Sequence, residues 1–84
     1  MKWRIEFSNR ADKFARKHGL LDTVTELIVT FLRVRNDMDV KVLKGKWKGY
    51  HRIRHSDIRV IFDLDTEKRI VFVDTIARRD NAYR

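Results

Sequence analysis

A dense group of cations between residues 43 and 60 is the part of this sequence best suited to chemistry. Its basic side chains are Lys44, Lys46, Lys48, Arg52, Arg54 and Arg59. A single acid, Asp57, and two aromatic residues, Trp47 and Tyr50, lie among them. The planar guanidinium group of arginine matches the oxygens of a phosphate, and lysine adds a compact positive charge. The segment therefore predicts a surface that binds phosphate groups.

Two predicted strands would position these arginines. Side chains alternate from residue 50 onward, so that one face carries Tyr50, Arg52 and Arg54 while the other carries His51, Ile53 and His55. Ser56 and Asp57 suit a tight turn, and residues 58–63 alternate again as a returning strand. A two-residue loop would place Arg54 opposite Arg59, and like charges in that position destabilise a sheet. We expect an anion such as phosphate to lie between them.

Metal and nucleophile chemistries fit the sequence poorly. Along a strand, His51 and His55 would be roughly 13 Å apart, which is too far to chelate one ion. We expect both histidines to pack at the edge of the core, with proton transfer as the alternative. The carboxylates show no spacing typical of a catalytic metal site, and no serine lies in a nucleophile motif. No metal and no cofactor are predicted.

The basic surface has two interpretations. Lysines and arginines on a sheet face often serve only solubility. A second basic cluster near the C-terminus, Arg78, Arg79 and Arg84 with Tyr83, favours nucleic-acid contact instead, because aromatic rings among cations can stack on bases. The residues predicted to bind nucleic acid are Lys44, Lys46, Lys48, Tyr50 and Arg78.

The rest of the chain predicts an α+β domain. Residues 2–7 alternate as an opening strand, Ser8 or Asn9 can cap a short helix, and Gly19 can end it. An apolar stripe over residues 20–32 predicts a second, longer helix. After the basic segment, residues 65–68 suit a turn and residues 69–76 a third strand of an antiparallel meander. The two helices should form a hairpin on one face of the sheet.

That turn also predicts a strand register and a core. It pairs Phe62 with Val71 and Val60 with Val73, and it places Arg59 opposite Asp74, where the acid would neutralise the arginine. The predicted core consists of Leu27, Ile28, Phe31, Ile53, Val60, Phe62, Val71 and Val73.

The length, charge and amino-acid composition limit which class of protein this chain can be. The chain has 84 residues, a net charge of +8, 43% hydrophobic and 38% charged residues, and no cysteine. These values predict one compact domain spanning residues 1–84, without disulfides, that attracts anionic partners. Because no apolar run resembles a signal peptide or a membrane span, we expect a cytoplasmic protein with no membrane partner.

Four motifs in order resemble the RelE/ParE toxin superfamily of bacterial and archaeal toxin–antitoxin pairs. They are LKG at residues 43–45, GYHRIR at 49–54, DIRVIF at 57–62 and RDNAYR at 79–84. The predicted order of strand, two helices and three strands also matches, so the resemblance covers nearly the whole chain. It is closer to the RelE branch, whose members cleave messenger RNA in the ribosomal A site, than to the ParE branch, which poisons DNA gyrase.

The resemblance implies a function and a site. It implies a metal-independent endoribonuclease whose catalytic groups are Arg52, Arg54, Arg59, Arg79 and Tyr83. It also implies three partners, an acidic antitoxin, the ribosome and messenger RNA, and a free toxin that is a monomer. The alternatives are a gyrase-directed toxin, a degenerate toxin that only sequesters an antitoxin, and a small RNA-binding module.

The sequence departs from the family pattern at the position of the general base. Some RelE enzymes have lysine where Arg52 and Arg54 stand, and many relatives have histidine or lysine where Arg78 stands. Arginine effectively never releases its proton and is a poor base. The remaining candidates are Tyr83 and the three lysines between residues 44 and 48, one of which would need a lowered pKa.

Overall fold

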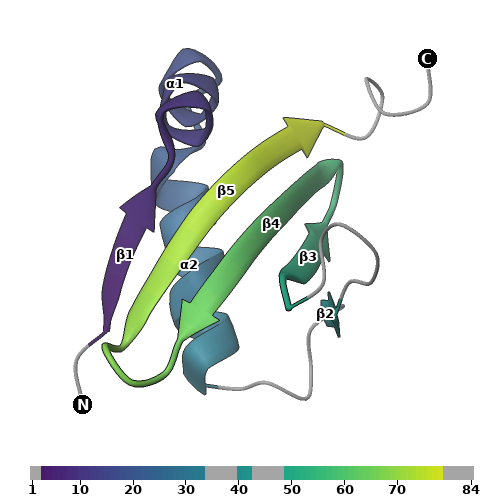
Figure 1. Cartoon of the computed structure of the whole chain (residues 1–84). Coiled ribbons are helices and arrows are strands. Elements are labelled where there is room, and N and C mark those ends of the chain that lie inside the picture. Colours follow the sequence, from purple (N-terminus) through teal and green to yellow (C-terminus); the bar gives the residue numbers. More distant parts are fainter. Residues whose placement is uncertain (1–2, 34–39, 43–48, 79–84) are drawn as a thin grey trace.

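The computed structural model describes residues 3–33, 40–42 and 49–78, and it confirms the predicted α+β class. Its elements are, in order, β1 (Arg4–Phe7), α1 (Asn9–Lys17), α2 (Leu21–Arg33), β2 (Val40–Val42), β3 (His51–His55), β4 (Ile58–Asp65) and β5 (Ile70–Arg78) (Figure 1). The short strand β2 was not predicted. It extends the sheet beyond β3 by pairing antiparallel with it.

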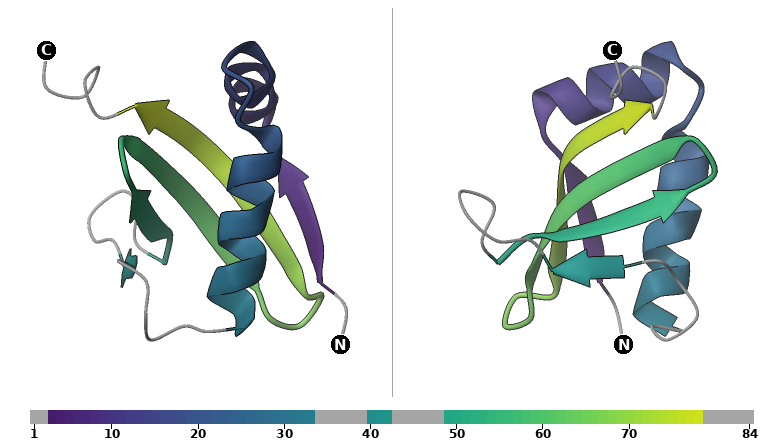
Figure 2. Two further views of the ribbon diagram at one scale, coloured as in Figure 1. Left: turned by 180° about the vertical axis from the view of Figure 1, so that it is seen from behind. Right: turned by 90° about the vertical axis from the view of Figure 1, so that its right-hand side faces the viewer.

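The five strands form one mixed sheet in the order β1-β5-β4-β3-β2. The meander from β3 to β5 is antiparallel, and β1 runs parallel to β5 at one edge. α2 crosses one face of this sheet, behind β4 and β5 in Figure 1 and in front of them in the reverse view of Figure 2. α2 therefore leaves the opposite face of the described sheet uncovered.

Local signals explain where the helices begin and end. The Ser8 hydroxyl accepts a hydrogen bond from the backbone N–H of Ala11 at 3.1 Å, which caps α1 as predicted. Gly19 has a φ of 64°, the left-handed conformation that ends the helix and turns the chain into α2. The helix hairpin thus follows from a cap and a glycine.

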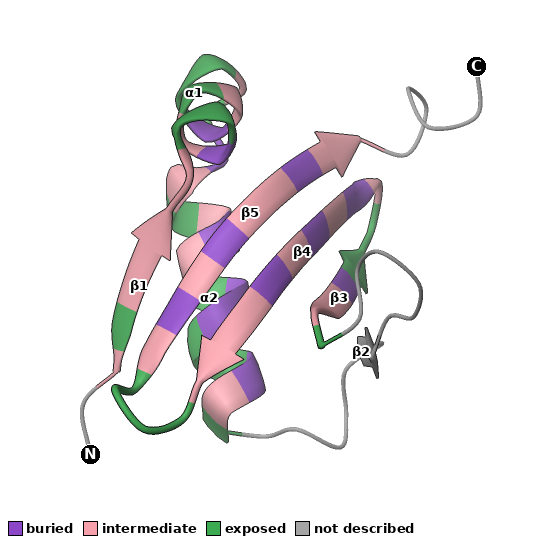
Figure 3. Cartoon of the chain, in the orientation of Figure 1, coloured by how far each residue is buried: buried purple, intermediate pink, exposed green. Residues whose placement is uncertain are grey.

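The core lies between the helices and the inner face of the sheet. All eight residues predicted for it are buried, with exposed fractions between 0% and 8%. Figure 3 shows the alternation of buried and half-buried positions along β4 and β5. Phe31 of α2 meets Phe62 of β4 edge to face, with ring centroids 5.2 Å apart, and this contact joins the two layers.

The predicted register is correct between β3 and β4 and wrong between β4 and β5. Arg54 lies opposite Arg59, across the predicted Ser56–Asp57 turn. In the next pair, however, Phe62 lies opposite Val73, Val60 opposite Ile76 and Arg59 opposite Ala77.

Two features of the β4–β5 hairpin cause the difference. β4 extends to Asp65, which pairs with Ile70, so the loop occupies residues 66–69 and shifts the partner by two positions. A bulge between Ile61 and Phe62 of β4 then leaves Asp74 of β5 without a partner in the ladder. It shifts the β5 partners of residues 58–61 by one further position. The proposed neutralisation of Arg59 by Asp74 is therefore wrong.

Asp74 instead connects the sheet to α1. Its carboxylate accepts hydrogen bonds from Arg10 at 2.8 Å and from the Thr75 hydroxyl at 2.7 Å, and its carbonyl accepts from the Ser8 hydroxyl at 2.7 Å. Burial raises the pKa of Asp74, but the Thr75 hydrogen bond and the hydrogen bond and charge of Arg10 outweigh it, so the pKa lies below its usual value. The bulge is held by these polar contacts.

Two features are absent from the part of the chain that the structure describes. No helix in this part of the chain is long and apolar enough to cross a membrane. Over the same residues, no group of three or more histidine, aspartate or glutamate side chains is placed to hold a metal ion.

Candidate nucleic-acid interface

Three arginines gather on the face of the sheet opposite the helices, and we call Arg52, Arg54 and Arg59 the arginine face. In one row across the sheet, Arg54 lies opposite Arg59, and Arg59 lies opposite Ala77. In the next row, Arg52 lies opposite Ile61, which lies opposite Thr75. The neighbours on β5, Ala77 and Thr75, have short side chains and carry no charge.

The charges of Arg54 and Arg59 are not neutralised within the described chain. Arg54 is exposed and Arg59 is half-buried. Among the residues that the structure describes, neither forms an ion pair or a side-chain hydrogen bond. Two like charges placed opposite each other repel, so this part of the surface is suited to binding an anion.

The turn that aligns these arginines has an unusual backbone. Ser56 has a φ of 58°, a left-handed conformation that non-glycine residues adopt uncommonly and that tight hairpin turns require. Ile53, between Arg52 and Arg54, is completely buried and fixes the register of β3 against the core. The arginine face is thus positioned by a tight turn and by a buried anchor.

Arg78 is separated from the arginine face. Its guanidinium group donates to the Asp57 carboxylate at 3.0 Å, and the exposed fractions of the two side chains are 33% and 47%. Arg78 pairs with Ile58, and strand alternation places it on the side of Ile76 rather than of Ala77. Asp57 stood out as the only acid in the basic segment, but its partner could not be inferred without the β4–β5 register.

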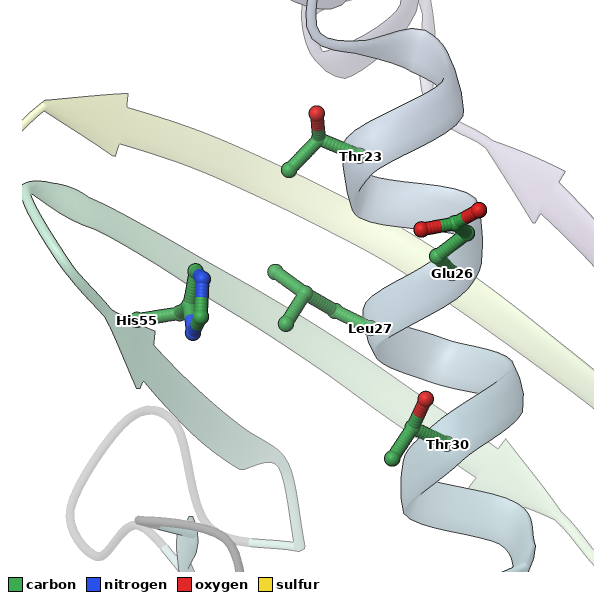
Figure 4. A pocket seen from close by; sticks show the side chains of 5 residues that line it. All are labelled: Thr23, Glu26, Leu27, Thr30 and His55. Atoms are coloured by element: carbon green, nitrogen blue, oxygen red, sulfur yellow. The ribbon is translucent and has the colours of Figure 1, made fainter.

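The histidines lie on the helix-facing side, as predicted. The ring of His51 stacks on Phe62 with centroids 5.4 Å apart and lies 6.0 Å from Phe31. His51 is half-buried, which confirms the packing role. The expected packing of His55 is wrong, because this side chain is exposed and lines an open cleft of about 340 Å³ beside α2. Figure 4 shows Thr23, Glu26, Leu27 and Thr30 on the other side of this cleft.

Five predicted site residues lie outside the described residues: Lys44, Lys46, Lys48, Arg79 and Tyr83. Tyr50 is described and half-buried, next to the start of β3. The described part of β5 ends at Arg78, opposite Ile58, next to the row that contains Arg54 and Arg59. β5 therefore ends on the side of the sheet where Arg54 and Arg59 lie (Figure 1).

Comparison with known proteins gives structural matches alone. No family model matches the sequence, and no curated protein matches it. YafQ from E. coli strain BL21(DE3) is 16% identical, with a TM-score of 0.67 over 99% of this chain and 100% of that chain. The toxin–antitoxin complex RelBE2 from Mycobacterium tuberculosis includes a chain that is 19% identical, with a TM-score of 0.66 over 94% of this chain and 100% of that one.

The archaeal RelE–RelB complex from Pyrococcus horikoshii OT3 gives a third match. Its matching chain is 20% identical, with a TM-score of 0.71 over 94% of this chain and 97% of that one. These likenesses span nearly the full length of each chain. The resemblance noted in the sequence is thus confirmed at the level of structure, and the protein has the fold of the RelE-like toxins.

Proposed function

We propose that this protein is the toxin of a type II toxin–antitoxin pair and that it cleaves messenger RNA on the ribosome. The observation that carries the proposal is the pairing of Arg54 with Arg59 on the face opposite the helices. Two arginines without acidic partners in the described chain provide strong, oriented donors for a phosphate. The RelE-like fold supports the same assignment.

The proposed reaction needs no metal. The 2'-hydroxyl of the message attacks the adjacent phosphorus, the bond to the 5'-oxygen breaks, and a 2',3'-cyclic phosphate forms. Negative charge accumulates on the non-bridging oxygens during this step, and Arg54 and Arg59 would stabilise it. Catalysis of phosphoryl transfer rests largely on such positioning and charge stabilisation. Arg52, in the next row, would orient the message.

The C-terminal residues complete the proposed site. Arg79 would neutralise the phosphorane together with Arg59, and Tyr83 would protonate the leaving 5'-oxygen. The arginines cannot serve as general base because they retain their protons. Lys44, Lys46 or Lys48 is the proposed general base. If Tyr83 is the base instead, another group must protonate the 5'-oxygen, because one phenol cannot accept and donate a proton in the same step.

The remaining basic residues would provide affinity. Lys44, Lys46 and Lys48 would bind ribosomal or messenger RNA, and Tyr50 would stack on a base. Arg78 donates from Nη1 to Asp57 and its Nε is buried, so its remaining terminal N–H groups are the donors that would contact RNA.

The proposed protein partner is an acidic antitoxin. The chain carries a net charge of +8, which favours rapid association with an acidic segment that folds on binding. The relatives from Pyrococcus horikoshii and Mycobacterium tuberculosis were solved as toxin–antitoxin complexes. We expect the complex to be tight and its association rate to fall with salt. Isolation of the protein from its native host as a free monomer at natural levels would contradict this.

Primer extension tests the proposed reaction. Messages from cells that express the protein should show new 5' ends within codons, at the position of the ribosomal A site. The control is a message whose start codon is mutated, because it should escape cleavage when the ribosome is required. If no message is cut but gyrase supercoiling is blocked, the protein is a ParE-like inhibitor.

A pair of variants tests the division between catalysis and affinity. Arg79→Ala should lower the single-turnover cleavage rate by about 10²-fold or more, the effect expected when one preorganised charge is removed, with little loss of ribosome binding. Lys46→Ala should weaken binding in a salt-dependent way and leave the rate at saturation nearly intact. If Arg79→Ala and Tyr83→Phe cleave as fast as the parent, the assigned site is wrong.

A further inference from the structure

Along the strands, the face that carries the arginines changes from basic to apolar and acidic side chains. One pleat beyond Ile61, the same side of β4 carries Asp63, which pairs with Phe72 of β5, and Phe72 pairs with Glu6 of β1. Ile61, Asp63 and Phe72 are all half-buried. A partly enclosed carboxylate between apolar side chains thus lies on the same face as the arginines.

The carboxylate of Asp63 has no polar partner in the described part of the chain. Over the described residues it accepts no side-chain hydrogen bond and joins no ion pair. Its neighbour on this face of the strand, Asp65, differs because its carboxylate accepts a hydrogen bond from the backbone N–H of Lys68 at 2.9 Å. Asp63 is therefore free to accept hydrogen bonds from a ligand.

The spacing suits a single nucleotide. Four residues along β4 place Asp63 roughly 13 Å from Arg59 between Cα atoms, at about 3.3 Å per residue, and Ile61 lies midway. A phosphate held by Arg54 and Arg59 would direct the attached sugar and base over Ile61, towards Asp63. A carboxylate repels phosphate, and at roughly 13 Å from Arg59 it lies beyond the adjoining sugar, so the group that reaches Asp63 is the base.

We propose that Asp63 belongs to a base-recognition site for guanine, with Ile61 and Phe72 as the apolar surface against which the base packs. A carboxylate can accept only, and guanine presents two adjacent N–H donors, N1–H and the N2 amino group, on one edge. Adenine and cytosine each offer one donor group and uracil one N–H on that edge. This inference rests on the proposed function, since the guanine would be the base on the 5' side of the scissile phosphate.

Titration with nucleotides tests the site without cleavage. The probes are guanosine 3'-monophosphate and inosine 3'-monophosphate, which lacks only the N2 amino group, and binding is followed by NMR of the isotopically labelled protein. The parent should bind the guanosine nucleotide about 10-fold or more tightly, the effect of one hydrogen bond to a charged acceptor. Asp63→Asn should remove this preference. Asp65→Asn, the matched control on the same face, should keep it.

The outcomes separate this inference from the proposed reaction. Equal binding of the two nucleotides by the parent, no detectable binding of either, or a preference that survives in Asp63→Asn would each overturn the guanine site. Messenger RNA cleavage would still support the proposed function in those cases. Guanine-selective binding that depends on Asp63, in a protein that cuts no message, would leave the base site in place and refute the nuclease.

Discussion

Replacing Arg54 with glutamine should make the free protein more stable. Arg54 and Arg59 lie directly opposite each other on adjacent strands, and neither charge is paired among the described residues. Two unit charges about 5 Å apart in water repel by about 0.8 kcal/mol, and opposed like charges in sheets cost a similar amount. Flexible guanidinium groups separate further, so we expect a gain of about 0.5 kcal/mol, or about 2–4 °C in Tm for a domain of this size.

Urea denaturation at low ionic strength measures this gain. The difference between parent and variant should shrink in 1 M salt, where the screening length falls to about 3 Å. Arg16→Gln is the matched control, because it removes a helical ion pair with Asp12 at 3.0 Å and should lower stability by about 0.3–0.5 kcal/mol. An Arg54→Gln protein that is less stable than the parent at low salt would refute the idea that the two arginines repel.

The remaining predictions concern the scaffold that positions the site. Phe31→Ala should destabilise the fold by about 3–5 kcal/mol because Phe31 is 4% exposed and packs on Phe62, whereas Val29→Ala, at a position 39% exposed, should have little effect; similar urea midpoints would show that α2 does not cover the core. Asp74→Asn should cost about 1 kcal/mol at neutral pH. Because the folded pKa of Asp74 is lowered, its contribution is present above the ordinary aspartate pKa and is lost as the pH falls through the folded value, so parent and variant should converge in thermal scans in acid; a constant difference down to low pH would contradict the lowered pKa. Ser56→Gly should raise Tm or leave it unchanged, since glycine adopts a φ of 58° without strain, and a marked fall in thermal unfolding would show that the serine side chain holds the turn.

Local patterns were sufficient to predict most of the fold. The cap at Ser8, the glycine at position 19 and the two-residue turn after β3 each act within a few residues, so their effects can be read from the sequence. The buried residues were also predicted correctly, even though the β4–β5 register was wrong. A shift of two positions in a strand keeps every side chain on its own face, so Val71 and Val73 remained in the core.

The bulge at Asp74 could not be predicted from the sequence and was found only in the structure. The carboxylate of Asp74 contacts Arg10, far away in sequence, and the bulge follows a loop whose length the turn residues alone do not fix. One local signal was present. The spacing of buried residues on β5 changes from two to three between Val73 and Ile76, which is the pattern expected when one extra residue enters a strand. The same shift decided the partners of Arg59 and Arg78.

The single-turnover cleavage rate of the Arg59→Ala protein tests the central claim most directly. It is measured with saturating ribosomes that carry a defined message, beside the parent and the control Lys13→Ala, whose exposed cation lies on α1. If the arginine face binds the scissile phosphate, the rate should fall about 10²-fold or more for Arg59→Ala and should not change for the control. A parent-like rate for Arg59→Ala would contradict the account.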